Sequence, residues 1–276
     1  MSVPQAVVNR VAEVLPVSYW EQRARRYATQ GQGLAAVCSY GMPEFYNRAI
    51  QITQRLALKP WLRELGDKQV LDVGCGVGRW SRWMAAHGAT VTGVDLSPTM
   101  VEEATRRARE EGVGVRCRFL AQDLTELDTG GRYQFILGVT VLQHILDDHR
   151  FRIAIQRLAD HLAPGGRMVL IEAAPTRSNS RCDSSIFRAR DIHGYLSVFS
   201  ECGLILESIT GVDPMPLKTM FLPYYRSLPK PLALFGLAAV TAVSLPIDAL
   251  FGRRWADRSW HKLFVLRHGA RKANAA

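Results

Sequence analysis

The residues best placed to do chemistry lie in a glycine-rich stretch, 70–80, which reads Val-Leu-Asp-Val-Gly-Cys-Gly-Val-Gly-Arg-Trp. A short apolar run that carries Asp72 meets Gly74, Gly76 and Gly78, and a helical pattern begins directly after them. A strand, a glycine-rich turn and a helix in this order bring bare backbone close to a nucleotide-like ligand. Glycine suits such a turn because a Cβ would obstruct its dihedral angles and the ligand's approach. The stretch therefore predicts a ligand site at the end of a strand.

Two further acids, Asp95 and Asp123, each follow a later strand-like run. Because ligands of a parallel sheet bind outside the carboxyl ends of its strands, we expect both acids beside the glycine turn. Asp95 suits hydrogen bonds from ribose hydroxyls, Asp123 suits the exocyclic amine of an adenine, and Met100 can pack on the flat base. Each feature alone is weak, since acids also cap helices. Together, in register along one sheet, they predict a nucleoside ligand.

The same stretch argues against a dinucleotide or a nucleoside triphosphate. Its glycines are spaced GxGxG rather than GxGxxG as in pyrophosphate-binding turns, and no Gly-Lys-Ser/Thr follows them. Asp72 would repel a phosphate, whereas it suits an amino-acid ammonium group or the amides of its own loop.

Strand-like and helical runs alternate from residue 70 onward. The strand-like runs are 70–73, 90–94, 115–120, 135–139, 167–172, 204–210 and 262–267. Helical patterns lie at 79–87, 97–111, 147–162 and 190–202. This alternation predicts an α/β fold in which helices cover both faces of a mostly parallel sheet. We expect this core to occupy residues 67–211.

The segment before the glycine turn is expected to form a helical cap over residues 1–66. Aromatic side chains at helical spacing predict a helix at 19–27, which is followed by a glycine-bearing loop at 31–43. A helix over 43–57 and a short one that ends near Gly66 complete the cap. Its aromatic rings either pack the cap or cover a ligand, and those considered for ligand contact are Tyr19, Trp20, Tyr27, Tyr40 and Tyr46.

This set of motifs resembles the class I S-adenosylmethionine-dependent methyltransferases of the small-molecule branch. The resemblance is carried by 70–80, Asp95, Asp123 and the Leu-Ala-Pro-Gly-Gly-Arg-Met-Val-Leu-Ile-Glu of 162–172, and it covers residues 66–210. It implies a Rossmann-like, seven-stranded sheet with an antiparallel last strand and S-adenosyl-L-methionine as the cofactor, and it names no metal ligand. The residues that it implies at the cofactor are Asp72, Gly74, Gly76, Gly78, Asp95, Leu96, Met100, Gln122, Asp123, Leu124, Val139, Gln143, Tyr19 and Tyr27.

The residues after the fourth strand-like run limit the class of methyl acceptor. The chain has Val-Leu-Gln-His there, where DNA and protein amide methylases resembling this fold have Asn/Asp-Pro-Pro-Tyr/Phe. No cysteine sits in the Pro-Cys loop that cysteine-dependent RNA methylases need. A small-molecule acceptor is left, with His144 as the candidate general base for an acceptor hydroxyl and His193 as a weaker second. A purely structural role for His144 fits the sequence equally well.

A long connection, 212–260, precedes the last strand and tail at 261–276. Residues 231–247 carry no charge, and a cluster of arginines and tryptophans follows. That composition is typical of an interfacial membrane segment, although a buried helix or a dimer contact fits it too. Arginines after the fifth strand could meet an anionic head group, and they are Arg177, Arg181, Arg188 and Arg190.

Composition limits the partners and the location. With 35 Lys and Arg against 25 Asp and Glu, the net charge of +10 suits an anionic substrate, a membrane surface or a nucleic acid, or serves solubility alone. Five scattered cysteines without a CxxC pair indicate reduced thiols. The N-terminus lacks the pattern of a signal peptide, so we expect a cytoplasmic protein with peripheral membrane contact and dimerisation left open.

The expected activity is methyl transfer to a small hydrophobic or lipid-linked, anionic or neutral acceptor, with O-methylation favoured. The main alternative is C-methylation of an isoprenyl diphosphate, in which Trp20, Tyr40 and Tyr46 would stabilise a carbocation and the arginines after the fifth strand would hold the diphosphate. A binding protein that keeps the cofactor site without transfer chemistry is the alternative from another class. An RNA substrate ranks low because no RNA-binding module is evident.

Overall fold

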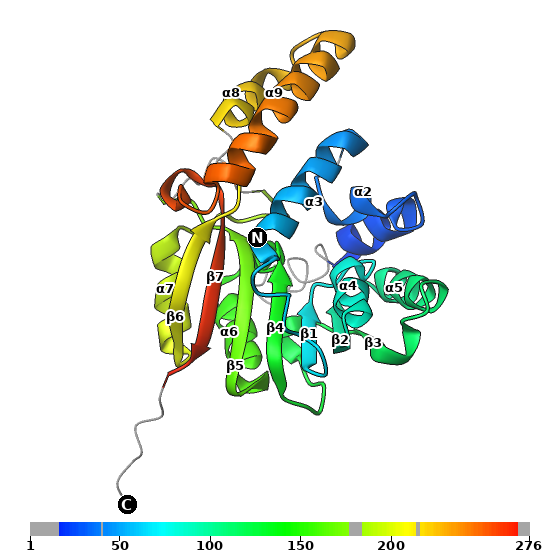
Figure 1. Cartoon of the computed structure of the whole chain (residues 1–276), viewed down its shortest axis with the longest axis vertical. Coiled ribbons are helices and arrows are strands. Elements are labelled where there is room, and N and C mark those ends of the chain that lie inside the picture. The colour runs from blue at the N-terminus through cyan, green and yellow to red at the C-terminus, as the bar shows by residue number, and fades with distance from the viewer. Residues whose placement is uncertain (1–16, 40, 177–183, 214–215, 270–276) are drawn as a thin grey trace, which may run out of the picture.

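A seven-stranded sheet forms the centre of the computed structural model, which describes residues 17–39, 41–176, 184–213 and 216–269 (Figure 1). Its strands are β1 (Gln69–Val73), β2 (Thr90–Asp95), β3 (Cys117–Ala121), β4 (Tyr133–Val139), β5 (Leu162–Ala173), β6 (Leu204–Gly211) and β7 (His261–His268). They are ordered β3-β2-β1-β4-β5-β7-β6. Strand β7 runs antiparallel to β5 and β6, whereas the other neighbouring strands are parallel. The prediction of a Rossmann-like sheet with an antiparallel last strand is confirmed.

The register of the sheet brings the predicted site to one edge. Val73 at the end of β1 pairs with Val94 of β2 and with Gly138 of β4. Asp95 at the end of β2 pairs with Ala121 of β3. The four strands therefore end level with one another, and the segments that follow them meet at the same edge.

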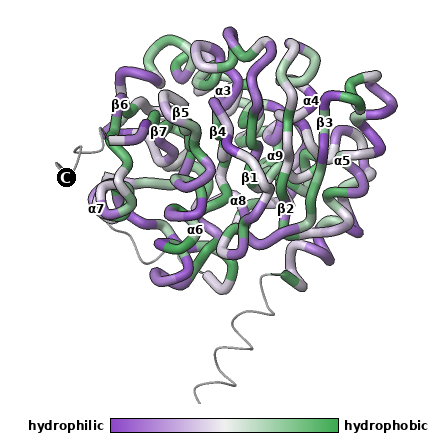
Figure 2. The backbone as a smooth tube through the Cα atoms, turned by 90° about the horizontal axis from the view of Figure 1, so that it is seen from below, coloured by the Kyte–Doolittle hydropathy of each residue, from purple (hydrophilic) through white to green (hydrophobic). Residues whose placement is uncertain are grey.

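Helices cover both faces of the sheet. Beyond a helical segment at 17–27, they are α2 (Leu34–Val37), α3 (Glu44–Leu58), α4 (Arg79–Ala86), α5 (Pro98–Glu110), α6 (Asp148–His161), α7 (Ile192–Glu201), α8 (Pro216–Tyr225) and α9 (Lys230–Phe251). Consecutive residues of β1 divide between the two faces: Leu71 packs in the core with α6 and α7, and Val70 in the core with α3 and α4. Hydrophobic stretches recur along the strands in Figure 2, as this two-sided burial requires.

Side-chain caps set the first residues of several helices. Ser97 accepts a hydrogen bond from the amide of Met100 at 3.2 Å, with Pro98 in the first turn of α5. Asp147 caps α6 and Asp191 caps α7 in the same way, each at 2.8 Å. These bonds satisfy amides that the helix itself leaves without a partner.

The structure departs from four local predictions, one of which is the strand predicted at 167–172, because β5 already begins at Leu162. The strand predicted at 115–120 begins at Cys117, because Gly114–Arg116 forms a turn of 3₁₀ helix. The loop predicted at 31–43 contains the short helix α2. No helix ends near Gly66, since the chain between α3 and β1 runs in turns.

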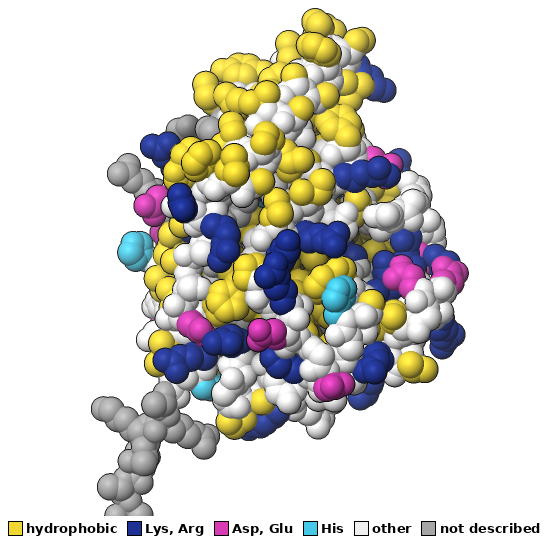
Figure 3. All heavy atoms as spheres, viewed as in Figure 1, with side chains coloured by type: hydrophobic (Ala, Val, Ile, Leu, Met, Phe, Trp, Pro, Cys, Tyr) yellow, Lys and Arg dark blue, Asp and Glu magenta, His cyan; other side chains and the backbone are white. Residues whose placement is uncertain are grey.

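The connection between β6 and β7 forms a helical hairpin of α8 and α9. It projects beyond the sheet in Figure 1 and carries many exposed apolar side chains in Figure 3. Helix α9 is long and apolar enough to cross a membrane by length and composition alone. Only 22% of its most apolar stretch is buried inside the protein. The interpretation of this segment as a buried helix is therefore wrong for the hairpin as described.

Candidate active site

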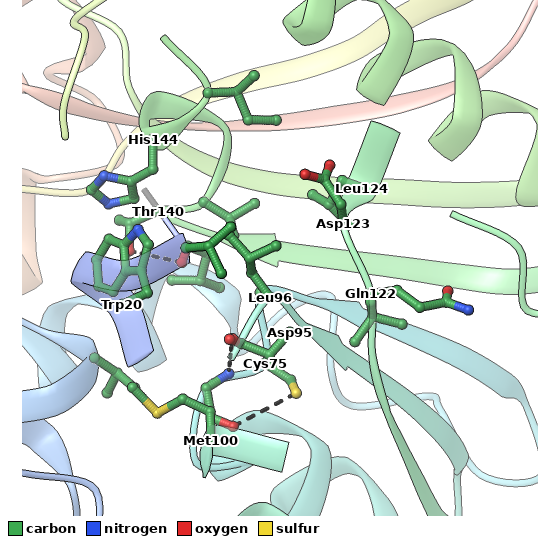
Figure 4. A pocket seen from close by; sticks show the side chains of 18 of the residues that line it. Trp20, Cys75, Asp95, Leu96, Met100, Gln122, Asp123, Leu124, Thr140 and His144 are labelled. Atoms are coloured by element: carbon green, nitrogen blue, oxygen red, sulfur yellow. Dashed lines mark hydrogen bonds between the residues drawn. The ribbon is translucent and has the colours of Figure 1, made fainter. Parts of the chain in front are cut away.

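A cavity of about 620 Å³ lies at the carboxyl edge of the sheet (Figure 4). Its volume is in the range of sites for small molecules and cofactors. The predicted site residues that line it are Trp20, Asp72, Gly74, Gly76, Asp95, Leu96, Met100, Gln122, Asp123, Leu124, Val139 and His144. They come from the helix at 17–27 and from the segments that end β1 to β4. The tertiary structure thus gathers residues that are far apart in the sequence around one cavity.

The glycine turn after β1 is needed for packing within the protein. Gly74 and Gly76 have φ values of +61° and +53°, which side chains rarely adopt. A Cβ on Gly74 would lie 1.8 Å from Val141, and one on Gly76 would lie 2.4 Å from Val37. Both valines line the cavity. The glycines therefore allow the walls of the cavity to pack closely against the turn. The reason expected from the sequence was a different one, direct contact with a ligand.

Asp72 lies under the floor of the cavity and is almost completely buried. The hydroxyl of Ser81 donates to its Oδ2 at 2.5 Å. Burial raises the pKa of Asp72 to about 7, although the bonds from Ser81 and the charge of Arg79 act against this rise. A buried carboxyl that is only partly compensated by the protein favours a cationic group of a ligand beside it.

Asp95 braces the glycine turn. Its Oδ2 accepts the amide N–H of Gly76 at 2.8 Å, and its Oδ1 accepts the amide N–H of Ser97 at 3.0 Å. Burial raises the pKa of Asp95, and these two amides offset part of the rise. Each carboxylate oxygen has a second lone pair, so Asp95 can hold the turn and still accept hydrogen bonds from a ligand.

Asp123 is engaged by the protein on both oxygens. The amide and hydroxyl of Thr125 donate to Oδ1 at 2.8 Å, and the Arg150 guanidinium pairs with Oδ2 at 2.7 Å. Arg150 also lines the cavity. This ion pair fixes the carboxylate at the cavity wall, where its remaining lone pairs can meet an amine.

The loop after β4 is held by a buried acid, Glu172. The amides of Val141 and Leu142 donate to its Oε1 at 3.0 Å, and the amide of Gln143 donates to its Oε2 at 3.1 Å. Burial raises the pKa of Glu172 to about 7, against the effect of these three amides. Just before them, Thr140 lines the cavity with a φ of +56°, a strained conformation for a β-branched residue. Glu172 therefore shapes the loop that presents Thr140 to the cavity.

His144 follows in the same loop and lines the cavity. Its Nδ1 lies 2.6 Å from the carbonyl oxygen of Ile186, which can only accept a hydrogen bond, so Nδ1 carries the proton. Burial lowers the pKa of His144 to about 4, which keeps the ring neutral near pH 7. The unprotonated Nε2, which lies 3.4 Å from the side-chain nitrogen Nε2 of Gln143, is thus the ring atom that can accept a proton.

The helix at 17–27 covers one side of the cavity through Trp20. The indole ring packs edge-on against the His144 ring, with 4.7 Å between the ring centroids, as Figure 4 shows. Glu21 anchors this helix: it accepts the hydroxyl protons of Ser97 and Thr99, both at 2.6 Å. Burial alone would raise the pKa of Glu21, but its hydrogen bonds from Ser97, Thr99 and Arg25 lower it to about 2.

Several predicted site residues lie outside the lining of the cavity. Gly78 is the N-cap residue of α4, Tyr19 packs edge-on against Trp20, and Tyr27, at the end of the helix at 17–27, packs against a small core cluster. Gln143 is buried, with its side-chain oxygen on the amide of Ala173 at 2.9 Å. Tyr46 is buried on α3, and His193 is exposed on α7. Tyr40, Arg177 and Arg181 lie outside the described residues.

Arg188 and Arg190, considered for an anionic head group, are committed to protein contacts. Both pair with Asp148, at 2.8 Å and 3.0 Å. Arg188 also donates to the carbonyl of Leu146, and Arg190 packs 4.0 Å over the ring of Phe151. These contacts tie the chain before α7 to α6, so they lend no support to an anion site.

Sequence reasoning missed Arg79 and the supporting residues Glu21 and Glu172. Arg79 lines the cavity, and its nearest polar partner is the side-chain oxygen of Gln54 at 2.7 Å. Its position directly after the last glycine was a usable signal, because a guanidinium there lies close to the turn. No local signal gives the supporting role of Glu21 or Glu172, since their partners are distant in sequence.

Comparison with known proteins agrees with this fold. A family model described as a methyltransferase domain matches residues 70–166. A ubiquinone biosynthesis O-methyltransferase from Coxiella burnetii is 31% identical over 186 residues, which cover 62% of this chain and 74% of that protein. Other relatives of this name match over only 38–45% of their own length.

Two solved structures have similar folds at low identity. Magnesium protoporphyrin IX methyltransferase from Synechocystis PCC 6803 has a TM-score of 0.60 at 18% identity and covers 93% of this chain and 100% of its own. Geranyl diphosphate C-methyltransferase from Streptomyces coelicolor A3(2) has a TM-score of 0.58 at 19% identity, with 91% and 98% coverage. With the Coxiella relative, these similarities show that the chain belongs to the class I S-adenosylmethionine-dependent methyltransferases.

Proposed function

We propose that this methyltransferase transfers a methyl group to a hydroxyl of a small hydrophobic or lipid-linked acceptor. The observation that carries the proposal is His144, a neutral histidine at the cavity wall whose Nε2 can accept a proton. A hydroxyl oxygen becomes a better nucleophile as it loses its proton, so a base in this position favours O-methylation. The names of the curated relatives support the same type of reaction.

The cavity fits the methyl donor that this family uses. S-adenosylmethionine, when bound, supplies an electrophilic methyl group on a sulfonium. Asp72 would hold its ammonium group and Arg79 its carboxylate, because the two side chains offer opposite charges at the glycine turn. Asp95 would accept from the ribose, and Asp123 would accept from the adenine amine, beside the apolar side chains of Met100 and Leu124.

The chain's own contribution to transfer is alignment and one proton transfer. Trp20 and Thr140 would confine the acceptor beside His144 and exclude water from it. This confinement would align the reacting oxygen for methyl transfer. The acceptor hydroxyl would give its proton to Nε2 of His144 as its oxygen takes the methyl group and the sulfur–methyl bond of the donor breaks. The demethylated donor and the methyl ether leave, and His144 then releases the proton to solvent.

C-methylation of an isoprenyl diphosphate remains a second candidate, supported by the fold shared with the Streptomyces enzyme. It is the weaker one, because Arg188 and Arg190 are bound to Asp148 and Tyr46 lies outside the cavity lining. Peripheral contact with a membrane forms part of the main proposal, since lipid-linked acceptors dissolve there. We propose a cytoplasmic enzyme that reaches such acceptors at the membrane surface.

A transfer assay separates these activities. Donor with a labelled methyl group is incubated with hydroxylated aromatic compounds bearing a prenyl tail, with the same compounds already O-methylated, and with prenyl diphosphates. The proposal expects label only in the first set. Label in prenyl diphosphates, or in the blocked compounds, would instead establish C-methylation.

A further inference from the structure

Helix α9 keeps its largest apolar side chains on its outer side and buries most of its polar ones. The side that it buries carries Thr241, Ser244 and Asp248, which are 8%, 1% and 5% exposed, together with Ala233 and Leu237. The side that it presents outward carries Phe235 and Leu250, which are 76% and 72% exposed. A surface helix of a water-soluble domain does the opposite, since burial of apolar area is the favourable term. This arrangement is suited to an apolar environment around the outer side of α9.

The apolar surface continues onto the neighbouring helix α8. We define the hairpin face as the exposed side chains of Met220 and Tyr224 on α8 and of Leu232, Phe235, Val243 and Leu250 on α9. The two helices pack against each other, and Figure 3 shows apolar side chains gathered over them. Exposed apolar surface of this kind marks a site of interaction with a protein or a membrane.

Positive charge lies at both ends of α9. Arg226 and Lys230 are exposed at the turn before the helix, and Arg253 and Arg254 are exposed directly after it. Residues 231–247 between them carry no charge. Leu250, Phe251, Arg253 and Arg254 line a surface hollow at the end of the helix, where apolar and guanidinium groups meet. Lipids with anionic head groups match both, because their acyl chains can contact the apolar groups and their head groups can pair with the guanidinium groups.

We propose that the hairpin face docks in the plane of an anionic lipid bilayer. In that orientation the apolar side chains enter the boundary between head groups and acyl chains, and the basic residues at both ends of α9 reach the head groups. A membrane-spanning hairpin does not fit, because the ten residues of α8 are about half the length that a span requires. A second copy of the chain fits less well, because a symmetric pair would bring cationic ends together.

The docking extends the membrane contact of the proposed function, but it does not depend on the chemistry in the cavity and is tested without it. The whole protein is floated on a density gradient with vesicles of phosphatidylcholine alone or of phosphatidylcholine mixed with the anionic lipid phosphatidylglycerol. The proposal expects flotation with the anionic vesicles and much less with the neutral ones. Protein that stays at the bottom of the gradient with both kinds would overturn it.

Two sets of variants assign the binding to the hairpin face. Leu232→Ser, Phe235→Ser and Leu250→Ser together should lower partitioning about tenfold or more, because each removes exposed apolar area without opening the core. Arg253→Glu with Arg254→Glu should lower partitioning into anionic vesicles by about thirtyfold or more and leave partitioning into neutral vesicles unchanged.

Matched controls change similar side chains elsewhere on the surface. Val115→Ser replaces an apolar residue that is 97% exposed, and Arg63→Glu with Arg132→Glu reverses two exposed charges away from the hairpin. Both controls should bind vesicles like the natural protein, and equal losses in the controls would overturn the assignment. Light scattering tests whether a second copy of the chain covers the hairpin face instead of a bilayer. If the natural protein is a dimer, the serine variant is a monomer and neither binds vesicles, then the hairpin face is a subunit interface.

Discussion

Asp72 should make donor binding depend on pH in a defined direction. In the ligand-free protein burial raises the pKa of this carboxyl to about 7. It is therefore about one-tenth ionised at pH 6 and about nine-tenths ionised at pH 8. A ligand ammonium group beside it stabilises the ionised form, so the pKa falls on binding and a proton is released. Affinity should then rise by about tenfold from pH 6 to pH 8, the ratio of the ionised fractions.

Titration calorimetry with the demethylated donor measures this effect. At pH 7 about half a proton should be released per site, which makes the observed heat depend on the ionisation heat of the buffer. Asp72→Asn keeps the shape of the side chain and removes its titration, so its affinity should be low and nearly independent of pH. Glu102→Gln, at an exposed position on α5, should bind like the natural protein at both pH values.

Two results would refute the reasoning. The first is an affinity for the natural protein that is flat or falls from pH 6 to pH 8, since that would mean that Asp72 is already ionised or is not near the ligand's cation. The second is an Asp72→Asn variant that keeps the full slope, which would transfer the effect to Asp95, whose pKa burial also raises.

Three further predictions follow from the same geometry. His144→Gln should lower kcat about a hundredfold or more, as expected for loss of a general base, while the Kd for the demethylated donor stays within about threefold; an unchanged kcat would leave His144 a structural role. Glu21→Gln removes charge-assisted bonds to Ser97 and Thr99, so the free energy of unfolding should fall by about 1–3 kcal/mol and trypsin should cut the helix at 17–27 faster, whereas Glu102→Gln should change neither. Glu172 has a pKa raised to about 7 from 4.5, so its contribution to stability is complete below pH 4.5 and is lost as pH rises through 7; urea unfolding at pH 5 and pH 8 should show a decrease of about 3 kcal/mol or less from this group, and Glu172→Gln should reduce that decrease.

The sequence by itself determined the fold of the core and the approximate place of the site. Alternating apolar runs encode strands and helices through local periodicity, and every predicted strand of the sheet is present in the structure. The glycine turn, Asp95 and Asp123 follow strands that end at the same edge, so their convergence on one cavity could be anticipated from the topology of parallel sheets.

The tertiary structure decided which partners the polar side chains have. Arg188 and Arg190 could have faced an anion, yet they bind Asp148, and Asp123 is paired with Arg150. Glu172 accepts hydrogen bonds from three backbone amides of the loop after β4. The two segments are about thirty residues apart, so no local sequence pattern encodes these bonds. Such choices depend on three-dimensional proximity and burial, which a one-dimensional pattern does not specify.

The same division applies to the long connection before β7. Its composition predicts an apolar helix with basic flanks, and α9 is that helix. Which side of α9 is buried could not be read from composition, because its apolar residues surround the helix and its few polar ones are short. Packing against α8 and α3 buries Thr241, Ser244 and Asp248 with two apolar residues and leaves the larger apolar side chains exposed. Only the tertiary structure therefore shows that the apolar surface faces outward, where a bilayer can meet it.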